Sequence, residues 1–196
     1  SMIHLGQRSY FDSLNESLRE QQALVLAEGV TDRTGRLDGN FSYQKLAELL
    51  GLAAQEKLPL EGRLIGTESL KDLGNRQPKT TDILPADIDL IEFDEQTITV
   101  LNALGRYFLN NDSFVEGIQQ FNHWAEENFG ADTEQVVMND LLQKRNRKVL
   151  SYLPKALQKY DTLVIPWGAL HMPGLESAIQ NRCFTLQNRT ERLSVN

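Results

Sequence analysis

Three side chains that can bind a metal ion follow short apolar runs that predict β-strands. Glu28 comes directly after the run 23–27, and His171 lies about one turn beyond the run 163–165. His4 follows a two-residue apolar stub that we interpret as the end of a strand. In open α/β sheets, ligands bind in the crevice at the carboxyl ends of the strands. Two imidazoles and one carboxylate converging there would suit a divalent metal with open positions for water. Such a metal would acidify the water and polarise a carbonyl.

The same residues also have structural interpretations. A carboxylate directly after a buried strand is costly without a partner, which favours a functional role for Glu28. His171 taken alone could equally be a hydrogen-bonded turn residue, and His4 could belong to a tail. We interpret His123, in the middle of a predicted helix, as an ordinary surface or packing residue. The basic run 144–148 predicts a solvated helix face, because neighbouring positions spread around a helix.

Composition narrows the class of protein. The chain has 196 residues, 40% of them hydrophobic and 24% charged, which is typical of one globular domain over 1–196. A net charge of -7 argues against a nucleic-acid-binding protein, which needs a surplus of Lys and Arg. No apolar run approaches the roughly 20 residues that span a bilayer. With one cysteine, neither an intrachain disulfide nor a structural zinc site with paired cysteines is expected.

Helices alternate with apolar runs along the chain. Continuous apolar runs at 24–27 and 162–165 predict strands buried on both faces, neighbouring and parallel. A third strand is expected at 184–186, and 58–85 is expected to be irregular with at most one short helix. Apolar spacing and cap residues predict helices at 9–20, 42–51, 94–110, 113–129, 133–160 and 174–180. Pro154 should kink or split the long helix that contains it.

This order of elements predicts an α/β fold. We expect a central, partly parallel sheet flanked by helices, with a helical insert over 94–160 between the two halves that carry the candidate residues. Two strands do not make a stable sheet. Further strands must therefore come from the irregular stretch, from upstream of Ser1, or from a partner chain.

Short motifs in both halves resemble the TraB/PrgY/GumN family, which is related to the Tiki metalloproteases and more distantly to ChaN-like and erythromycin-esterase-like proteins. The opening motif is an apolar strand, a G-x-x-H sequence, a helix and a strand ending in glutamate. The closing part carries an arginine-asparagine pair, a strand and a second G-x-x-H. The matching segments here are His4-Leu5-Gly6, Tyr10-Phe11, 25–30, Ala86-Asp87, Arg145-Asn146, 163–165 and 168–171.

The resemblance implies a divalent-metal-dependent hydrolase that acts on peptide or amide bonds. His4, Glu28 and His171 would be the metal ligands, with Glu28 as a ligand or general base. Arg145 would bind a carboxylate, either that of a substrate or Glu28 itself, or stabilise an oxyanion. The metal would be manganese or cobalt, with zinc or iron as alternatives. The rival hypothesis is a ChaN-like protein that binds haem, iron or a peptide without turnover.

The amino-terminal motif leads to three further expectations. Ser1 stands where the family has glycine, and without a strand ahead of His4 nothing fixes its backbone. His4 should therefore be the weakest of the three ligands, and this chain should bind little or no transition metal and show little hydrolysis. An apolar sheet edge left without its first strand should be covered by an intramolecular segment or by a partner chain in a homodimer. The expected partners are otherwise a peptide or small-molecule substrate, with no nucleic acid and no membrane span. A signal or anchor upstream of Ser1 would place the protein in the cell envelope or outside the cell.

Overall fold

The computed structural model describes residues 5–6, 16, 23–38, 53–54, 62–72, 81–109 and 113–189. The helices predicted over 9–20 and 42–51 therefore lie almost wholly outside the described residues, and so does His4. The strands are β1 (Leu5–Gly6), β2 (Leu24–Ala27), β3 (Ala53–Ala54), β4 (Arg63–Leu64), β5 (Asp82–Pro85) and β6 (Leu163–Val164). The helices are α3 (Ser69–Asp72), α4 (Glu95–Leu109), α5 (Phe114–Asn128), α6 (Thr133–Met138), α7 (Arg145–Ala156) and α8 (Met172–Gln180).

The described residues also form three shorter or irregular helical segments. Two are 3-10 turns, η1 (Leu90–Glu92) and η3 (Ala169–His171). The third, η2 (Asn139–Lys144), is a π-helix that joins α6 to α7 without a break. None of the helices in the described part of the chain is both long enough and apolar enough to span a bilayer.

A four-stranded parallel sheet in the order β4-β5-β2-β6 forms the centre of the fold, as expected for an α/β protein. Leu24 pairs with Leu163 and Val25 with Val164, which confirms that the two apolar runs are parallel neighbours. The run at β2 is buried, as its lack of alternation predicts. The run at β6 is only half-buried, because this strand is at the edge of the four-stranded sheet. The prediction that this run is buried on both faces was therefore wrong.

The missing strands come from the stretch expected to be irregular. β5 lies beside β2 over four residue pairs, and β4 continues the sheet beyond β5. The short helix α3 follows β4 in the same stretch. The last predicted strand, at 184–186, was wrong: the chain has no strand there and Phe184 and Leu186 are exposed. A separate two-residue pairing joins β1 to β3 in antiparallel orientation.

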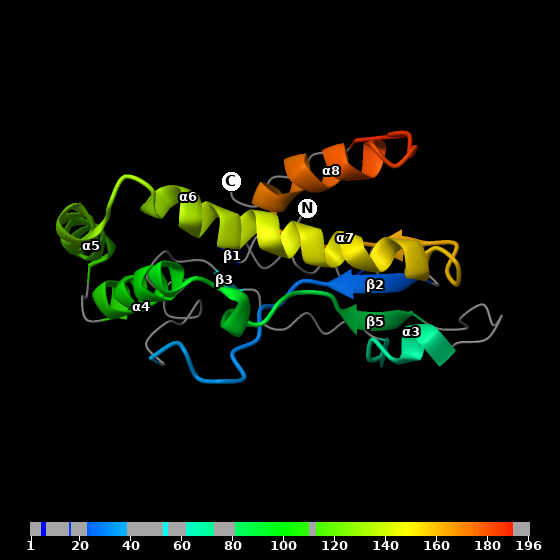
Figure 1. Ribbon diagram of the computed structural model, residues 1–196, viewed down its shortest axis with the longest axis horizontal. Helices are drawn as coiled ribbons and strands as arrows, with labels where there is room; N and C mark the ends of the chain where they lie inside the picture. Colours follow the sequence, from blue (N-terminus) through cyan, green and yellow to red (C-terminus); the bar gives the residue numbers. More distant parts are fainter. Residues whose placement is uncertain are drawn as a thin grey trace.

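The main core lies where α7 and α8 pack against the sheet. In Figure 1, α7 runs alongside β2, with α8 on its other side. Buried residues of α7 (Val149 and Leu153) cluster with Leu24 and Leu26 of β2 and with Leu175 of α8. Because each apolar CH₂ removed from water contributes about 0.8 kcal/mol, this contact stabilises α7 against the sheet. It thereby fixes the first turn of α7 near the carboxyl ends of the strands.

The helices α4, α5 and α6 lie beyond the carboxyl ends of the strands (Figure 1). A second buried cluster (Ile88, Leu90, Phe93 and Ile98) joins η1 to the start of α4. Tyr107 of α4 and three aromatic residues of the next helix and its end form a chain of ring contacts with centroids 5.2–6.4 Å apart: Phe121, Trp124 and Phe129. These ring contacts hold α4 against α5.

The expected break in the long helix is not at Pro154. The irregular turn is η2, the six residues directly before α7, and α7 continues past Pro154 to Ala156. A proline in a helix leaves the carbonyl four residues earlier without its usual N–H donor. Here the guanidinium Nη1 of Arg182 donates to that carbonyl, of Leu150, at 2.9 Å. This external donor explains why the helix tolerates the proline.

Candidate functional site

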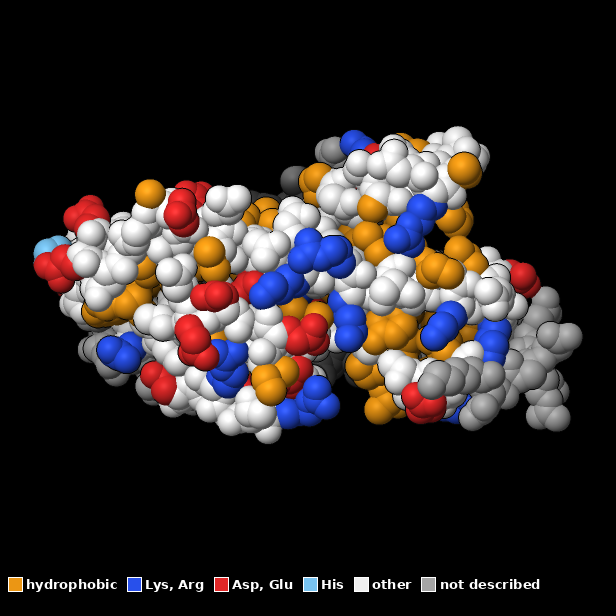
Figure 2. Space-filling model, viewed as in Figure 1, with side chains coloured by type: hydrophobic (Ala, Val, Ile, Leu, Met, Phe, Trp, Pro, Cys, Tyr) orange, Lys and Arg blue, Asp and Glu red, His pale blue; other side chains and the backbone are white. Residues whose placement is uncertain are grey.

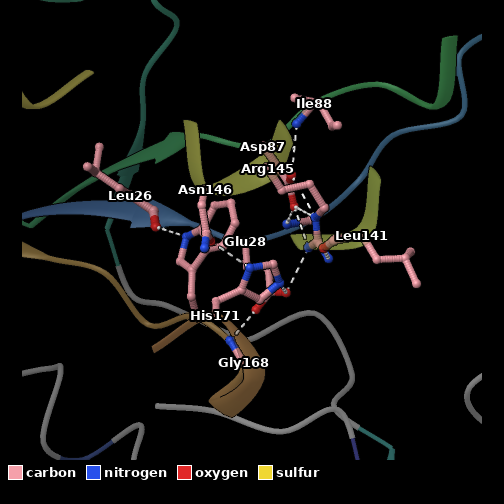
Figure 3. A network of polar contacts seen from close by, with 11 residues as sticks. Leu26, Glu28, Asp87, Ile88, Leu141, Arg145, Asn146, Gly168 and His171 are labelled. Carbon is pink, nitrogen blue, oxygen red and sulfur yellow. Dashed lines mark hydrogen bonds and ion pairs between the residues drawn. The ribbon is translucent and has the colours of Figure 1, made fainter. Parts of the chain in front are cut away.

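Three strand ends and the first turn of α7 bring the candidate residues together (Figure 3). Glu28 follows β2 directly, Asp87 follows β5 by two residues, and the turn 168–171 follows β6. Since the three strands are parallel neighbours, these segments leave the sheet at the same end. Arg145, the first residue of α7, lies between the two carboxylates.

Arg145 joins Glu28 and Asp87 in one ionic network. Its Nη2 is 2.7 Å from Oε1 of Glu28 and 2.7 Å from Oδ2 of Asp87. Its Nε donates to Oδ1 of Asp87 at 3.0 Å, so the guanidinium holds Asp87 with two donors. Nη1 donates to the carbonyl of Leu141 at 3.3 Å. This paired geometry needs the planar fork of an arginine, which lysine does not have.

The network is almost fully removed from solvent. The side chains of Glu28, Asp87 and Arg145 are 3%, 1% and 9% exposed. Burial alone would lower the pKa of Arg145, but hydrogen bonds and charge from Asp87 and Glu28 outweigh it and raise that pKa. Arg145 is therefore a permanent cation here. It binds the two carboxyl groups from one guanidinium.

The second carboxylate oxygen of Glu28 also accepts a hydrogen bond. The backbone N–H of Gly168 donates to Oε2 at 2.7 Å, which ties the end of β2 to the turn after β6. On the other side, the backbone N–H of Gly29 donates to Oδ2 of Asp87 at 3.0 Å. Gly29 has φ +156°, a conformation that residues with side chains rarely adopt. The glycine after Glu28 therefore allows the backbone to turn toward Asp87.

Trp167 forms the floor of the site. It is fully buried, and its Nε1 donates to the carbonyl of Leu26 at 2.9 Å. The guanidinium carbon of Arg145 is 5.4 Å from the centroid of the indole ring, within the range of a cation–π interaction. The imidazole of His171 meets the same ring edge-on, with centroids 5.0 Å apart. The indole thus contacts both the cation and the imidazole.

His171 is oriented by Asn146. Its Nδ1 is 2.7 Å from Oδ1 of Asn146, and both residues are buried. An amide oxygen only accepts, so the ring proton lies on Nδ1 and donates to it. Nε2 is on the opposite side of the ring, 3.5 Å from Oε1 of Glu28. Gly174 leaves room for the side chain of Asn146, because a Cβ at Gly174 would lie 2.7 Å from Nδ2 of Asn146.

One oxygen and one nitrogen of the site have the spacing of two ligands on a divalent metal. Oxygen and nitrogen ligands lie about 2.1 Å from zinc in a tetrahedral site, so two of them are about 3.4 Å apart. Oε1 of Glu28 and Nε2 of His171 are 3.5 Å apart. A metal-bound histidine also usually donates its other N–H to an oxygen, as His171 does to Asn146.

The described residues do not supply a third ligand. Among them, no group of three or more His, Cys, Asp or Glu side chains is placed to hold a metal. Asp87 is 1% exposed and turned toward Arg145. The third ligand of the predicted set, His4, lies outside the described residues.

The structure brings Glu28, Arg145 and His171 together, as expected from the sequence. Arg145 was expected to bind either a substrate carboxylate or Glu28, and it contacts Glu28. His123 is exposed on α5, 3.5 Å from Glu127, in agreement with its interpretation as an ordinary surface residue. Sequence reasoning gave no role to Asp87. It also follows a strand, and Pro85 hid that signal by making the run look like a loop.

Comparisons with models of protein families, with curated proteins and with solved structures found no match to this chain.

Proposed function

We propose that this protein is a divalent-metal-dependent hydrolase with Glu28, His171 and His4 as its metal ligands. Manganese or cobalt is the proposed metal, by resemblance to the TraB/PrgY/GumN family, with zinc or iron as alternatives. The same resemblance suggests peptide or amide bonds as the substrate. A metal-dependent site of this kind needs open coordination positions, which a set of three protein ligands leaves.

One observation carries the proposal. Oε1 of Glu28 and Nε2 of His171 are 3.5 Å apart at the carboxyl ends of two parallel strands, while Nδ1 of the imidazole faces Asn146. The distance matches the spacing of two ligands on one ion, and in a neutral imidazole the hydrogen bond from Nδ1 leaves the lone pair on Nε2.

The residues of the chain have separate tasks in this proposal. Arg145 and the N–H of Gly168 orient the carboxylate of Glu28, so that Oε1 faces His171. Asn146 fixes the ring of His171. A bound divalent ion supplies an acidified water and a polarised carbonyl. With its donors on Glu28, Asp87 and Leu141, Arg145 is a positioning residue and does not need to contact the substrate.

Cobalt binding tests the metal site directly. Titration with Co²⁺, followed by its visible absorption and by calorimetry, should show weak binding to the unaltered protein that approaches one equivalent only at high Co²⁺, because His4 is the weakest ligand. His171→Ala and Glu28→Gln should each weaken binding by roughly 100-fold or more, because a ligand is lost. His123→Ala is the matched control and should bind as the unaltered protein does, since His123 is exposed on α5. Binding that His171→Ala leaves unchanged would contradict the site.

Turnover separates the hydrolase from its rival. At saturating metal the protein should cleave members of a fluorogenic peptide library slowly, and activity should fall with a chelator and return with Mn²⁺ or Co²⁺. Tight metal binding through His171 without cleavage would favour the non-catalytic haem-, iron- or peptide-binding alternative. His4→Ala tests the third ligand. Loss of metal binding would support His4 as a ligand, and unchanged metal affinity would exclude it.

A further inference from the structure

Charge is divided sharply along the second half of the chain. Residues 107–143 contain no Lys or Arg but seven acidic residues: Asp112, Glu116, Glu126, Glu127, Asp132, Glu134 and Asp140. Residues 144–160 contain no Asp or Glu but six basic residues: Lys144, Arg145, Arg147, Lys148, Lys155 and Lys159. An alternating pattern, typical of a helix with internal ion pairs, is absent from both segments.

The basic segment presents several charges outward from α7. We call Arg147, Lys148 and Lys155 the basic face; Lys148 and Lys155 are seven residues apart and so lie on one side of the helix. Arg147 and Lys155 are exposed and Lys148 is half-buried. None of the three forms an ion pair with a described residue. By contrast, Lys144 pairs with Asp140 at 2.6 Å and Arg145 is buried in the candidate site.

The acidic segment presents the complementary charges at the other end of the molecule. We call Glu126, Asp132 and Glu134, at the junction of α5 and α6, the acidic face. All three side chains are exposed, and none forms an ion pair within the described part of the chain. Figure 2 shows acidic side chains over α5 and α6 and basic side chains over α7, on the same side of the molecule.

Apolar side chains are exposed in the same segments. Val115 of α5 is 62% exposed and Met138 of α6 is 42% exposed, while Leu157 at the end of α7 is 42% exposed. Stable protein interfaces combine an apolar centre with a polar or charged rim. Single exposed apolar residues are ordinary, but Val115 and Met138 lie on the helices that carry the acidic face, whereas Leu157 is on the side of α7 opposite Lys148. The acidic face thus combines charged and apolar side chains, as an interface does.

We propose that the basic face of one chain docks on the acidic face of a second copy, in a two-fold dimer. Because acidic side chains over α5 and α6 and basic side chains over α7 lie on the same side of the molecule (Figure 2), a two-fold axis brings each acidic face against the basic face of the other copy, so the contact forms twice. The partner is a second copy because the chain itself carries the complementary charges. An anionic membrane or a nucleic acid would be repelled by the net charge of -7.

Sedimentation velocity at two ionic strengths tests the dimer. At about 0.05 M NaCl the protein should sediment as a dimer in the micromolar range, and at about 0.5 M its dissociation constant should rise roughly tenfold or more, because the screening length shortens about threefold. Lys148→Glu should weaken the dimer at low salt. Arg106→Glu changes the charge equally at an exposed residue of α4 outside both faces, and should not weaken it.

A charge exchange makes the test independent of misfolding. K148E/K155E and E126K/E134K should each be monomeric at low salt, because one face then repels its partner. An equal mixture of the two variants should sediment as a heterodimer, since every contact again joins opposite charges. A monomer at low salt, a dimer that neither double variant disrupts, or a mixture that stays monomeric would each overturn the proposal. Binding of the monomer to phosphatidylserine vesicles through Lys148 and Lys155 would also overturn it.

Discussion

The guanidinium of Arg145 is 2.7 Å from the carboxylate of Glu28, although 117 positions separate the two residues. Two features of the fold create this contact. β2 ends at Ala27 with its carboxyl end toward α7, and α7 begins with Arg145 after an unbroken π-helical turn. A π-turn changes which side chain faces the sheet, and such turns are frequent at functional sites.

Replacing Arg145 should destabilise the protein strongly. Arg145→Met leaves the carboxylates of Glu28 and Asp87 buried without their cation, which we expect to cost about 3–5 kcal/mol of unfolding free energy. Arg145→Lys should restore only part of that, because one ammonium cannot hold both carboxylates in the observed geometry. Urea denaturation at neutral pH measures both values.

A double variant isolates the cause of that loss. Adding Asp87→Asn to Arg145→Met removes one buried charge, so the double variant should be more stable than Arg145→Met alone. Additive losses would show that the guanidinium acts by packing against Trp167 and not by neutralising the carboxylates.

Gly174→Ala should disturb His171 through Asn146. Alanine favours a helix over glycine by about 1 kcal/mol, yet its Cβ would lie 2.7 Å from Nδ2 of Asn146, and overpacking of this kind costs about 1–3 kcal/mol. We expect a net loss of stability and a shift of the His171 ring signals in NMR spectra. Gly130→Ala is the control, because a Cβ at Gly130 meets nothing within 4 Å. Equal effects of the two substitutions would contradict the contact.

The sequence predicted those strands whose own residues form an uninterrupted apolar run. The uninterrupted apolar run at β2 predicted a buried strand, and its parallel partner β6 followed from the same argument. β5 was missed because Pro78 precedes it and Pro85 is its last residue, which made the segment look irregular. The predicted strand at 184–186 was wrong, because two apolar residues beside a threonine carry no information about a neighbouring strand.

The candidate site, too, could be predicted from the sequence only in part. Glu28 and His171 could be predicted from their positions after strands, but the roles of Asp87 and Trp167 depend on side chains meeting across the sheet. Asp87 needs the guanidinium of Arg145 to be on its side of α7, and that depends on the π-turn η2. A π-turn has no sequence pattern that periodicity detects, since it differs from an α-helix by a single residue.

Acid should weaken the fold through Asp82. Asp82 is fully buried and bound by Nε of Arg63 at 2.9 Å and by the hydroxyl of Tyr160 at 2.7 Å. Burial would raise its pKa, but these hydrogen bonds and the charge of Arg63 lower it below the usual value. A carboxyl with a lowered pKa stabilises the fold above its unfolded pKa, and that stability is lost as pH falls through the folded pKa.

The measurement compares Asp82→Asn with the unaltered protein across pH. The variant should be less stable at neutral pH, and its unfolding free energy should fall less between about pH 5 and pH 2 than that of the unaltered protein. Glu92→Gln, at an exposed position, is the control and should keep the pH dependence. Parallel pH profiles for Asp82→Asn and the unaltered protein would show that the carboxyl does not titrate with unfolding.

Arg182 should be needed only while residue 154 is a proline. The guanidinium donates at 2.9 Å to the carbonyl of Leu150, the carbonyl that Pro154 leaves without an intrahelical donor. Arg182→Ala should cost about 1–3 kcal/mol, the usual penalty for a buried acceptor that loses its partner. In a Pro154→Ala background the N–H of residue 154 bonds this carbonyl, so the same substitution should cost much less. Urea denaturation of the four proteins gives the coupling energy, and a value near zero would mean that Arg182 does not compensate for the proline.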